Sequence, residues 1–225
     1  MSKSTRGVNN MSINQNPNVI KANELIGMNA VNALKKRGFE AEYAATSEEA
    51  LKRVLEIIPE NASVGIPGTV TVRAIGALDA LKARGNDVRQ HWGGLSKEEM
   101  KAARFAENDA EYFLTSANAL TRDGEIINID GSGNRVAGMA WGKGPVIFVI
   151  GINKLAFDLS DGIKRARSAT IPNAIRQHVE TACVKAGRCV MCMNDESMCR
   201  ATLILERPLK GRKYHVIIVG ENLGY

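Results

Sequence analysis

The four cysteines of the chain lie close together in the sequence, and their side chains have the clearest potential for chemistry. They follow the spacing C-x5-C-x2-C-x6-C, and no other cysteine occurs in the 225 residues; the four are Cys183, Cys189, Cys192 and Cys199. Cysteine thiolates bind zinc ions and iron–sulfur clusters, and four of them complete the ligand set of either. Basic residues interleave with the cysteines, and nearby positive charge is expected to lower thiol pKa values and favour the thiolate. We therefore predict a metal-binding loop over residues 183–199.

The spacing leaves the nature of the metal open. Zinc sites built from four cysteines usually contain two C-x2-C pairs, and this chain has one, Cys189 and Cys192. One compact run of four favours an iron–sulfur cluster as the cofactor, although the spacing matches no ferredoxin, and zinc is the alternative. Two disulfides or four unrelated buried thiols are the interpretations without a metal.

A second group of candidate residues follows two predicted strands. The first strand, at residues 63–65, runs into Pro67-Gly68-Thr69, a turn without the lysine of a Walker loop or the G-x-G-x-x-G pattern. The second strand, VIFVI at 146–150, is the most apolar run of the chain and leads into Gly151-Ile152-Asn153-Lys154. Ligands of α/β proteins bind at the C-terminal ends of such strands. We expect the Lys154 side chain and the Thr69 amide to converge on one anion, a carboxylate or a phosphate.

A third turn, GSGNR at 131–135, follows a strand predicted at residues 125–130. Arg73 joins the candidates because it lies about one helical turn beyond Thr69 and can pair with an anion. The predicted ligand-binding residues are Gly65, Gly68, Thr69, Arg73, Asp130, Gly131, Gly133, Asn134, Arg135, Asn153 and Lys154. The alternatives are an ordinary turn at 131–135, a solvated arginine at 73 and a surface lysine at 154.

The three histidines are scattered along the sequence. None has a cysteine or a carboxylate at the spacing of a catalytic triad, so His91, His178 and His215 are expected to be structural.

The elements that must position these residues alternate between strands and helices. This order predicts an α/β fold with a mostly parallel sheet flanked by helices. The last two strands, Ala201–Leu205 and Tyr214–Gly220, are expected to form an antiparallel pair across a short connection. Residues 1–17 are polar and Asn-rich and predict a disordered or loose arm, followed by a single domain over residues 18–225.

Composition limits the class of partner. The net charge is +6, and residues 161–225 carry 11 Lys and Arg against 6 Asp and Glu, so most of the excess lies in the cysteine-bearing third. Because aromatic content is 5% and no nucleic-acid-binding motif occurs, we expect an anionic small molecule or an acidic protein partner rather than nucleic acid. No apolar run predicts a membrane span or a signal peptide, so we expect a cytoplasmic protein.

Four sequence segments carry a family resemblance. They are SANA at 116–119, DGSGNRV at 130–136, VIGINK at 149–154 and VGENLGY at 219–225. With these segments the chain resembles the LUD-domain, or lactate-utilisation, proteins from about residue 20 onward. The four cysteines are similar to those of the branch of the family that carries a C-terminal cysteine motif. Relatives often have Gly-Gly-Ser where this chain has Pro67-Gly68-Thr69, so anion binding by that turn is the least supported part of the resemblance.

The resemblance implies the fold shared by CoA-transferases and ribose-5-phosphate isomerases. It also implies a role in oxidising lactate to pyruvate, as one component of an iron–sulfur redox system with protein partners. Catalysis by the chain alone and homo-oligomerisation stay open. The alternatives are a CoA- or phosphosugar-type transferase or isomerase on the same fold, for which no catalytic glutamate loop is evident, and a non-enzymatic, zinc-stapled assembly subunit.

Overall fold

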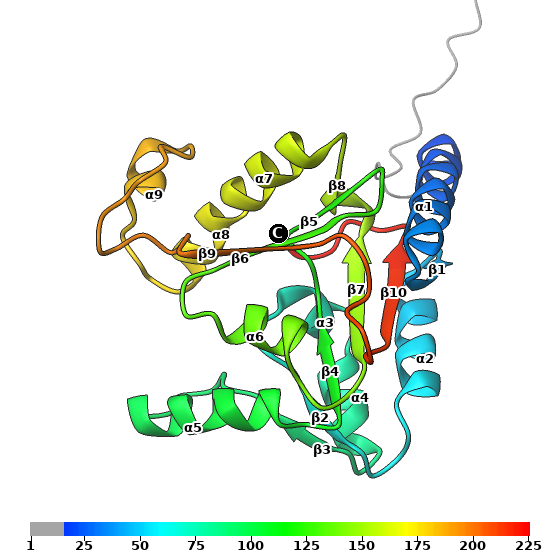
Figure 1. Cartoon of the computed structure of the whole chain (residues 1–225), viewed down its shortest axis with the longest axis horizontal. Helices are drawn as coiled ribbons and strands as arrows, with labels where there is room; N and C mark the ends of the chain where they lie inside the picture. Colours follow the sequence, from blue (N-terminus) through cyan, green and yellow to red (C-terminus); the bar gives the residue numbers. More distant parts are fainter. Residues whose placement is uncertain (1–15) are drawn as a thin grey trace, which may run out of the picture.

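The computed structural model describes residues 16–225 (Figure 1). Most of the predicted arm, residues 1–15, lies outside the described residues. Of the remaining two residues of the arm, Asn16 caps the first helix and Pro17 begins it. Proline suits the first position of a helix because its ring fixes φ and it has no backbone N–H to be satisfied. Gly38 ends the helix in the left-handed region, at φ 95°.

The elements alternate as the sequence predicts. The helices are α1 (Pro17–Arg37), α2 (Ser47–Ile57), α3 (Val70–Ala74), α4 (Ala77–Ala83), α5 (Lys97–Asn108), α6 (Asn134–Ala140), α7 (Leu159–Ser168), α8 (Thr170–Arg176) and α9 (Ala182–Ala186), with a 3-10 turn η2 (Ile152–Lys154). The strands are β1 (Glu40–Ala44), β2 (Ser63–Gly65), β3 (Asp87–Arg89), β4 (Tyr112–Thr115), β5 (Ala119–Thr121), β6 (Ile126–Asp130), β7 (Val146–Gly151), β8 (Leu155–Ala156), β9 (Ala201–Leu205) and β10 (Tyr214–Val219).

A six-stranded parallel sheet, in the order β1-β10-β7-β4-β2-β3, forms the centre of the molecule. All six residues of β7 are buried, because both faces of this strand are covered. Phe148 and Ile150 pack into a cluster with α1 and the second sheet, whereas Ile147 and Val149 pack against α2, α3 and α4. The predicted α/β fold with a mostly parallel sheet is therefore confirmed.

A second, four-stranded sheet, in the order β8-β5-β6-β9, lies between the parallel sheet and α7. Leu120 and Ile126 face the core of the parallel sheet, while Ala119, Ile127 and Ile129 face α7. Strand β6 pairs antiparallel with both β5 and β9, and β5 pairs parallel with β8.

The predicted antiparallel pairing of the last two strands is wrong. Strand β9 pairs with β6 in the second sheet, and β10 enters the parallel sheet between β1 and β7 (Figure 1). Burial explains the separation, since five of the six residues of β10 are buried, as a central strand requires, whereas one residue of β9 is. The connection between them crosses from one sheet to the other instead of folding back as a hairpin.

Four strands of the parallel sheet deliver their following residues to one edge. The segments after β2, β4, β7 and β10 meet there, beneath the second sheet and α8, because parallel strands all end on the same side. Within residues 16–225, no helix combines the length and the apolar composition that crossing a bilayer would require.

Candidate ligand-binding cleft

Lys154 lies at the point where the strand ends converge. Its side chain is buried, with 4% of the residue exposed. Its ammonium nitrogen donates to Thr71 Oγ1 at 2.8 Å and to Ser116 Oγ at 3.0 Å, so it joins the segments that follow β7, β2 and β4. Within the part of the chain that the structure describes, no carboxylate pairs with this lysine, although a buried charge usually has such a partner.

The surroundings of Lys154 disfavour its charged form. Burial lowers the Lys154 pKa from 10.5 to about 7, and the charges of Arg165 and Arg135 add to the effect. Arg165 is itself held in place, since it donates to the carbonyl oxygens of Asn153 and Asn118. At neutral pH the Lys154 side chain is therefore divided between ammonium and amine.

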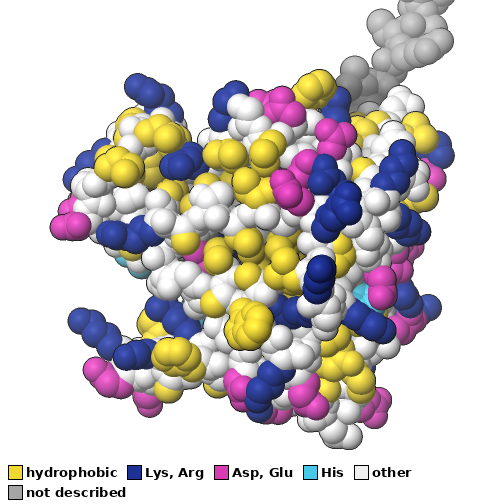
Figure 2. All heavy atoms as spheres, in the orientation of Figure 1, with side chains coloured by type: hydrophobic (Ala, Val, Ile, Leu, Met, Phe, Trp, Pro, Cys, Tyr) yellow, Lys and Arg dark blue, Asp and Glu magenta, His cyan; other side chains and the backbone are white. Residues whose placement is uncertain are grey.

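Two adjoining cavities form the cleft. The inner cavity, of about 30 Å³, is lined by Lys154, by the turn from Gly68 to Thr71 and by the Ser116–Asn118 segment. The outer cavity, of about 120 Å³, opens between α5 and α8. Gly68, Asn118, Arg135 and Asn173 line both cavities, so the two adjoin. Figure 2 shows the surface indented on this side, between the part formed by α5 and the part formed by α9.

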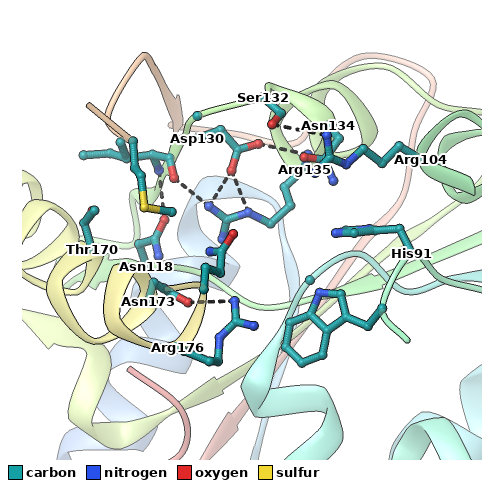
Figure 3. Close-up of a pocket in the computed structure, with 16 residues that line it drawn as sticks. His91, Arg104, Asn118, Asp130, Ser132, Asn134, Arg135, Thr170, Asn173 and Arg176 are labelled. Atoms are coloured by element: carbon teal, nitrogen blue, oxygen red, sulfur yellow. Dashed lines mark hydrogen bonds and ion pairs between the residues drawn. The ribbon is translucent and has the colours of Figure 1, made fainter. Parts of the chain in front are cut away.

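Arg135 separates the inner from the outer cavity and is fixed by Asp130. The Asp130 carboxylate accepts from Arg135 Nε at 2.6 Å and from the backbone N–H groups of Arg135 and Val136 at 2.9 and 3.0 Å. Arg135 Nη2 donates to the Ile129 carbonyl and also meets Asp130 (Figure 3). Arg135 Nη1 has no hydrogen-bond partner within the described residues, so one edge of this guanidinium is available to a ligand.

Two further arginines enter the outer cavity from opposite sides. Arg104 extends from α5 and donates to Ser132 at 3.4 Å; Arg176 extends from α8 and donates to Asn173 at 3.3 Å (Figure 3). Neither forms an ion pair within residues 16–225, and the Nε atom of each is buried without a partner. The one carboxylate that lines the outer cavity, Asp130, is occupied by Arg135. The cleft therefore carries an excess of positive charge.

Trp92 connects α3 and α8 at the rim of the outer cavity. The guanidinium carbons of Arg73 and Arg176 lie 4.2 and 4.3 Å from the centroid of its ring, distances that suit cation–π contacts. Burial lowers the pKa of both arginines. Arg73 also donates to Gln90 at 2.8 Å, and it lines neither cavity.

His91 lines the outer cavity and rests on a buried carboxylate. Its Nδ1 lies 2.6 Å from Oε1 of Glu107, a residue that is 1% exposed and whose other carboxylate oxygen is buried without a partner. Figure 3 shows the imidazole directed toward the middle of the cleft. A carboxylate on one ring nitrogen fixes the orientation of the ring and leaves the other nitrogen free. The spacing of the sequence did not indicate this contact, because the fold supplies a carboxylate that is 16 residues away in sequence.

Residues 221–225 pack beside the inner cavity, and Tyr225 lines it. Leu223 N donates to Asn153 Oδ1 at 3.0 Å, and Thr71 Oγ1 donates to the Leu223 carbonyl at 3.3 Å. Gly224, at φ 63°, passes so close that a Cβ would overlap Thr71 Oγ1 and lie 3.3 Å from Lys154 Nζ. A glycine is needed here for both its conformation and its size.

The structure brings most of the predicted ligand-binding residues to the cleft. Those that line one or both cavities are Gly68, Thr69, Asp130, Gly131, Asn134, Arg135 and Lys154. Four do not: Gly65 packs inside β2 against the backbone of Glu107, Arg73 stacks on Trp92, Gly133 precedes α6, and Asn153 binds residues 223 and 224.

Sequence reasoning missed the cleft residues that come from distant elements. They include His91, Arg104, Asn118, Asn173 and Arg176. Asn118 lies in the SANA segment, which was a usable signal. The others stand in α5, in α8 and in the loop after β3, and no spacing in the sequence links them.

Cys183 lies in α9, and Cys189 and Cys192 lie in the segment that follows it. Cys199 lies next to α8, with its sulfur 3.3 Å from Oγ1 of Thr170, a residue that lines the outer cavity. Cys183 is buried and the other three are half-buried. Within residues 16–225, no three His, Cys, Asp or Glu side chains are arranged to hold a metal ion. Burial raises the pKa of the Cys199 thiol, while Thr170 and Arg167 act in the opposite direction. A basic residue therefore does favour the Cys199 thiolate, as the sequence indicates, but burial outweighs it and the pKa is raised.

Comparison with known proteins agrees with this architecture. A family model described as the LUD domain matches residues 28–219. The crystal structure of a DUF162 family protein from Deinococcus radiodurans is similar at a TM-score of 0.51 and 14% identity, over 88% of this chain and 98% of that chain, which supports the fold. The search of curated proteins gives no match. Because the family model spans most of the sequence, the chain belongs to the LUD domain family, which is associated with lactate utilisation.

Proposed function

We propose that this LUD-domain protein binds a small organic acid of the lactate and pyruvate type in the cleft between α5 and α8. One observation carries the proposal: Arg104, Arg176 and Lys154 line the cleft, and none has a carboxylate partner within the described residues. Desolvated cations without a partner are costly, and an anionic ligand removes that cost.

The size and lining of the cleft favour a small ligand. Together the two cavities offer about 150 Å³, with mostly polar walls. The amides of Asn118 and Asn173 line both cavities and can accept from or donate to hydroxyl and carbonyl groups. The free edge of Arg135 adds a donor between the cavities. These groups match a molecule with one carboxylate and one neighbouring oxygen.

Calorimetry with lactate and pyruvate tests the proposal. A charged hydrogen bond contributes about 1.5–3 kcal/mol, so Arg104→Gln and Arg176→Gln are each expected to weaken binding by about tenfold to a hundredfold. Lys101→Gln is the matched control, because Lys101 is exposed on the same helix as Arg104 and outside the cleft. Equal weakening by the control, or no binding of either acid to the native protein, would contradict the proposal.

A role in a redox system is a separate proposal that rests on the cysteines. Its support is that the four cysteines of the chain fall within residues 183–199. As placed, these side chains do not form a ligand set for an iron–sulfur cluster or zinc, so no step of acid binding is assigned to a metal.

A further inference from the structure

Lys154 has a feature that carboxylate binding does not require. Its nitrogen is buried, it borders the inner cavity, and its partners within the described residues are two hydroxyl oxygens. A lysine that serves only to attract an anion remains an ammonium, whereas this one loses its proton readily, with a pKa of about 7. Lysines desolvated in this way act as nucleophiles toward carbonyl groups.

We propose that Lys154 forms a reversible imine with the carbonyl carbon of a 2-oxo acid bound in the cleft. The proposal rests on the proposed function and narrows it, because it names the oxo acid, rather than the hydroxy acid, as the ligand that reacts.

The geometry around Lys154 suits this chemistry. Thr71 Oγ1 and Ser116 Oγ hold the nitrogen at 2.8 and 3.0 Å, which leaves its remaining direction for the inner cavity. The inner cavity, at about 30 Å³, is larger than the space that one water needs and admits the carbonyl end of a small acid. The free Nη1 of Arg135, which lines the same cavity, is placed to receive the carboxylate beside that carbonyl.

The reaction balances without a further reagent. The amine lone pair forms a C–N bond with the carbonyl carbon, and the C=O π bond breaks to give a carbinolamine. Loss of water then gives the imine; both hydrogens of the water come from the amine, through the Thr71 and Ser116 hydroxyls. Nothing is oxidised or reduced, and water reverses the reaction. The free amine is the reacting form, so imine formation should increase about tenfold between about pH 6 and about pH 8.

Borohydride trapping tests the proposal on the whole protein. Pyruvate plus sodium borohydride should give one stable adduct by intact mass spectrometry, and peptide mapping should place it on Lys154. Lactate has no carbonyl group and should give none. Lys154→Met should abolish the adduct, while Lys164→Met, at an exposed lysine of α7, should retain it. If Lys154→Met fails to fold, peptide mapping of the native protein still decides the site.

The outcomes separate the two proposals. If calorimetry shows that pyruvate and lactate bind but no adduct maps to Lys154, the imine is excluded and acid binding stands. Adducts spread over exposed lysines, or a yield that does not change with pH, also overturn the imine. If neither acid binds and no adduct forms, both proposals fail.

Discussion

At the scale of single residues, the cleft is defined by how each charge is or is not neutralised. Asp130 and Arg135 neutralise one another, and Glu107 supports His91. Lys154, Arg104 and Arg176 have hydroxyl or amide partners instead of carboxylates. Buried or half-buried cations without a carboxylate partner lower the stability of the folded protein when no ligand is bound. Such groups are typical of functional sites.

The stability of the protein is expected to depend on pH through Lys154. Its pKa is about 7 in the folded protein and about 10.5 when unfolded, so between these values the unfolded chain binds more protons and the free energy of unfolding rises with pH. This destabilisation is fully present below about pH 7, where it is on the order of 5 kcal/mol, and it disappears above about pH 10.5. Lys154→Met removes this cost but leaves two hydroxyls without their donor, at roughly 1 kcal/mol each.

Urea unfolding at several pH values measures this effect. Lys154→Met should be more stable than the native protein near pH 6, and the difference should shrink and reverse as the pH approaches 10. Lys164→Met, at an exposed position, should show no such trend. A stability difference that stays constant with pH would show that Lys154 has an ordinary pKa.

At the scale of elements, the cleft depends on segments that cross the ends of the parallel strands. Each strand of the parallel sheet is held in place by packing in the hydrophobic core. The residues that follow the strand are held by only a few polar contacts. Residues 221–224 are an example, since Glu221 accepts from Ser47 and Leu223 is anchored on Asn153. This segment contacts the site of Lys154 through Thr71, which donates to the Leu223 carbonyl and accepts from Lys154.

We predict that Gly224→Ala disrupts this arrangement. An alanine at φ 63° is strained by about 1–2 kcal/mol, and its Cβ would also overlap Thr71 Oγ1, the partner of Lys154. Gly187→Ala is the matched control, because Gly187 has φ 66° and open space around it. Thermal unfolding should show a larger loss for Gly224→Ala than for Gly187→Ala, together with weaker binding of small acids. Equal losses would mean that only backbone strain matters.

At the scale of the whole molecule, the cleft lies between two different parts. One side is the parallel sheet with α3 and α5, and the other is α8, which leads through α9 into the cysteine segment. Trp92 joins the two sides by stacking with Arg73 and Arg176. Arg176, a residue of the cleft, ends α8, and residues 177–181 separate it from the start of α9.

Metal analysis tests the prediction for the cysteine segment. Protein purified without oxygen should contain iron with sulfide, or zinc, and Cys189→Ser with Cys192→Ser should lower the bound metal. Ser substitution removes the soft thiolate ligand while keeping the size of the side chain. Metal at background level in the native protein, with four freely titrating thiols, would exclude the site.

The sequence by itself determined the elements and their class. Hydrophobic runs such as VIFVI, the capping box at Ser96 and Glu99, and the glycine at position 38 act over a few residues, so they can be read along the chain. The same local logic placed Lys154 and the turn at 67–69 at the ends of two strands of the parallel sheet, where parallel topology brings them together. The turn at 131–135 follows β6 of the second sheet and reaches the cleft through the packing of that sheet.

Only the tertiary structure decided which charges lack partners and which strands pair. Burial of Lys154, the contact of His91 with Glu107, and the entry of Arg104 and Arg176 into one cleft depend on packing between elements far apart in sequence. Strands β9 and β10 belong to different sheets because β10 occupies a central position of the parallel sheet, where both of its faces are covered. Each of these features depends on the free energy of burial and of polar contacts between residues far apart in sequence. A pattern of neighbouring residues therefore cannot predict them.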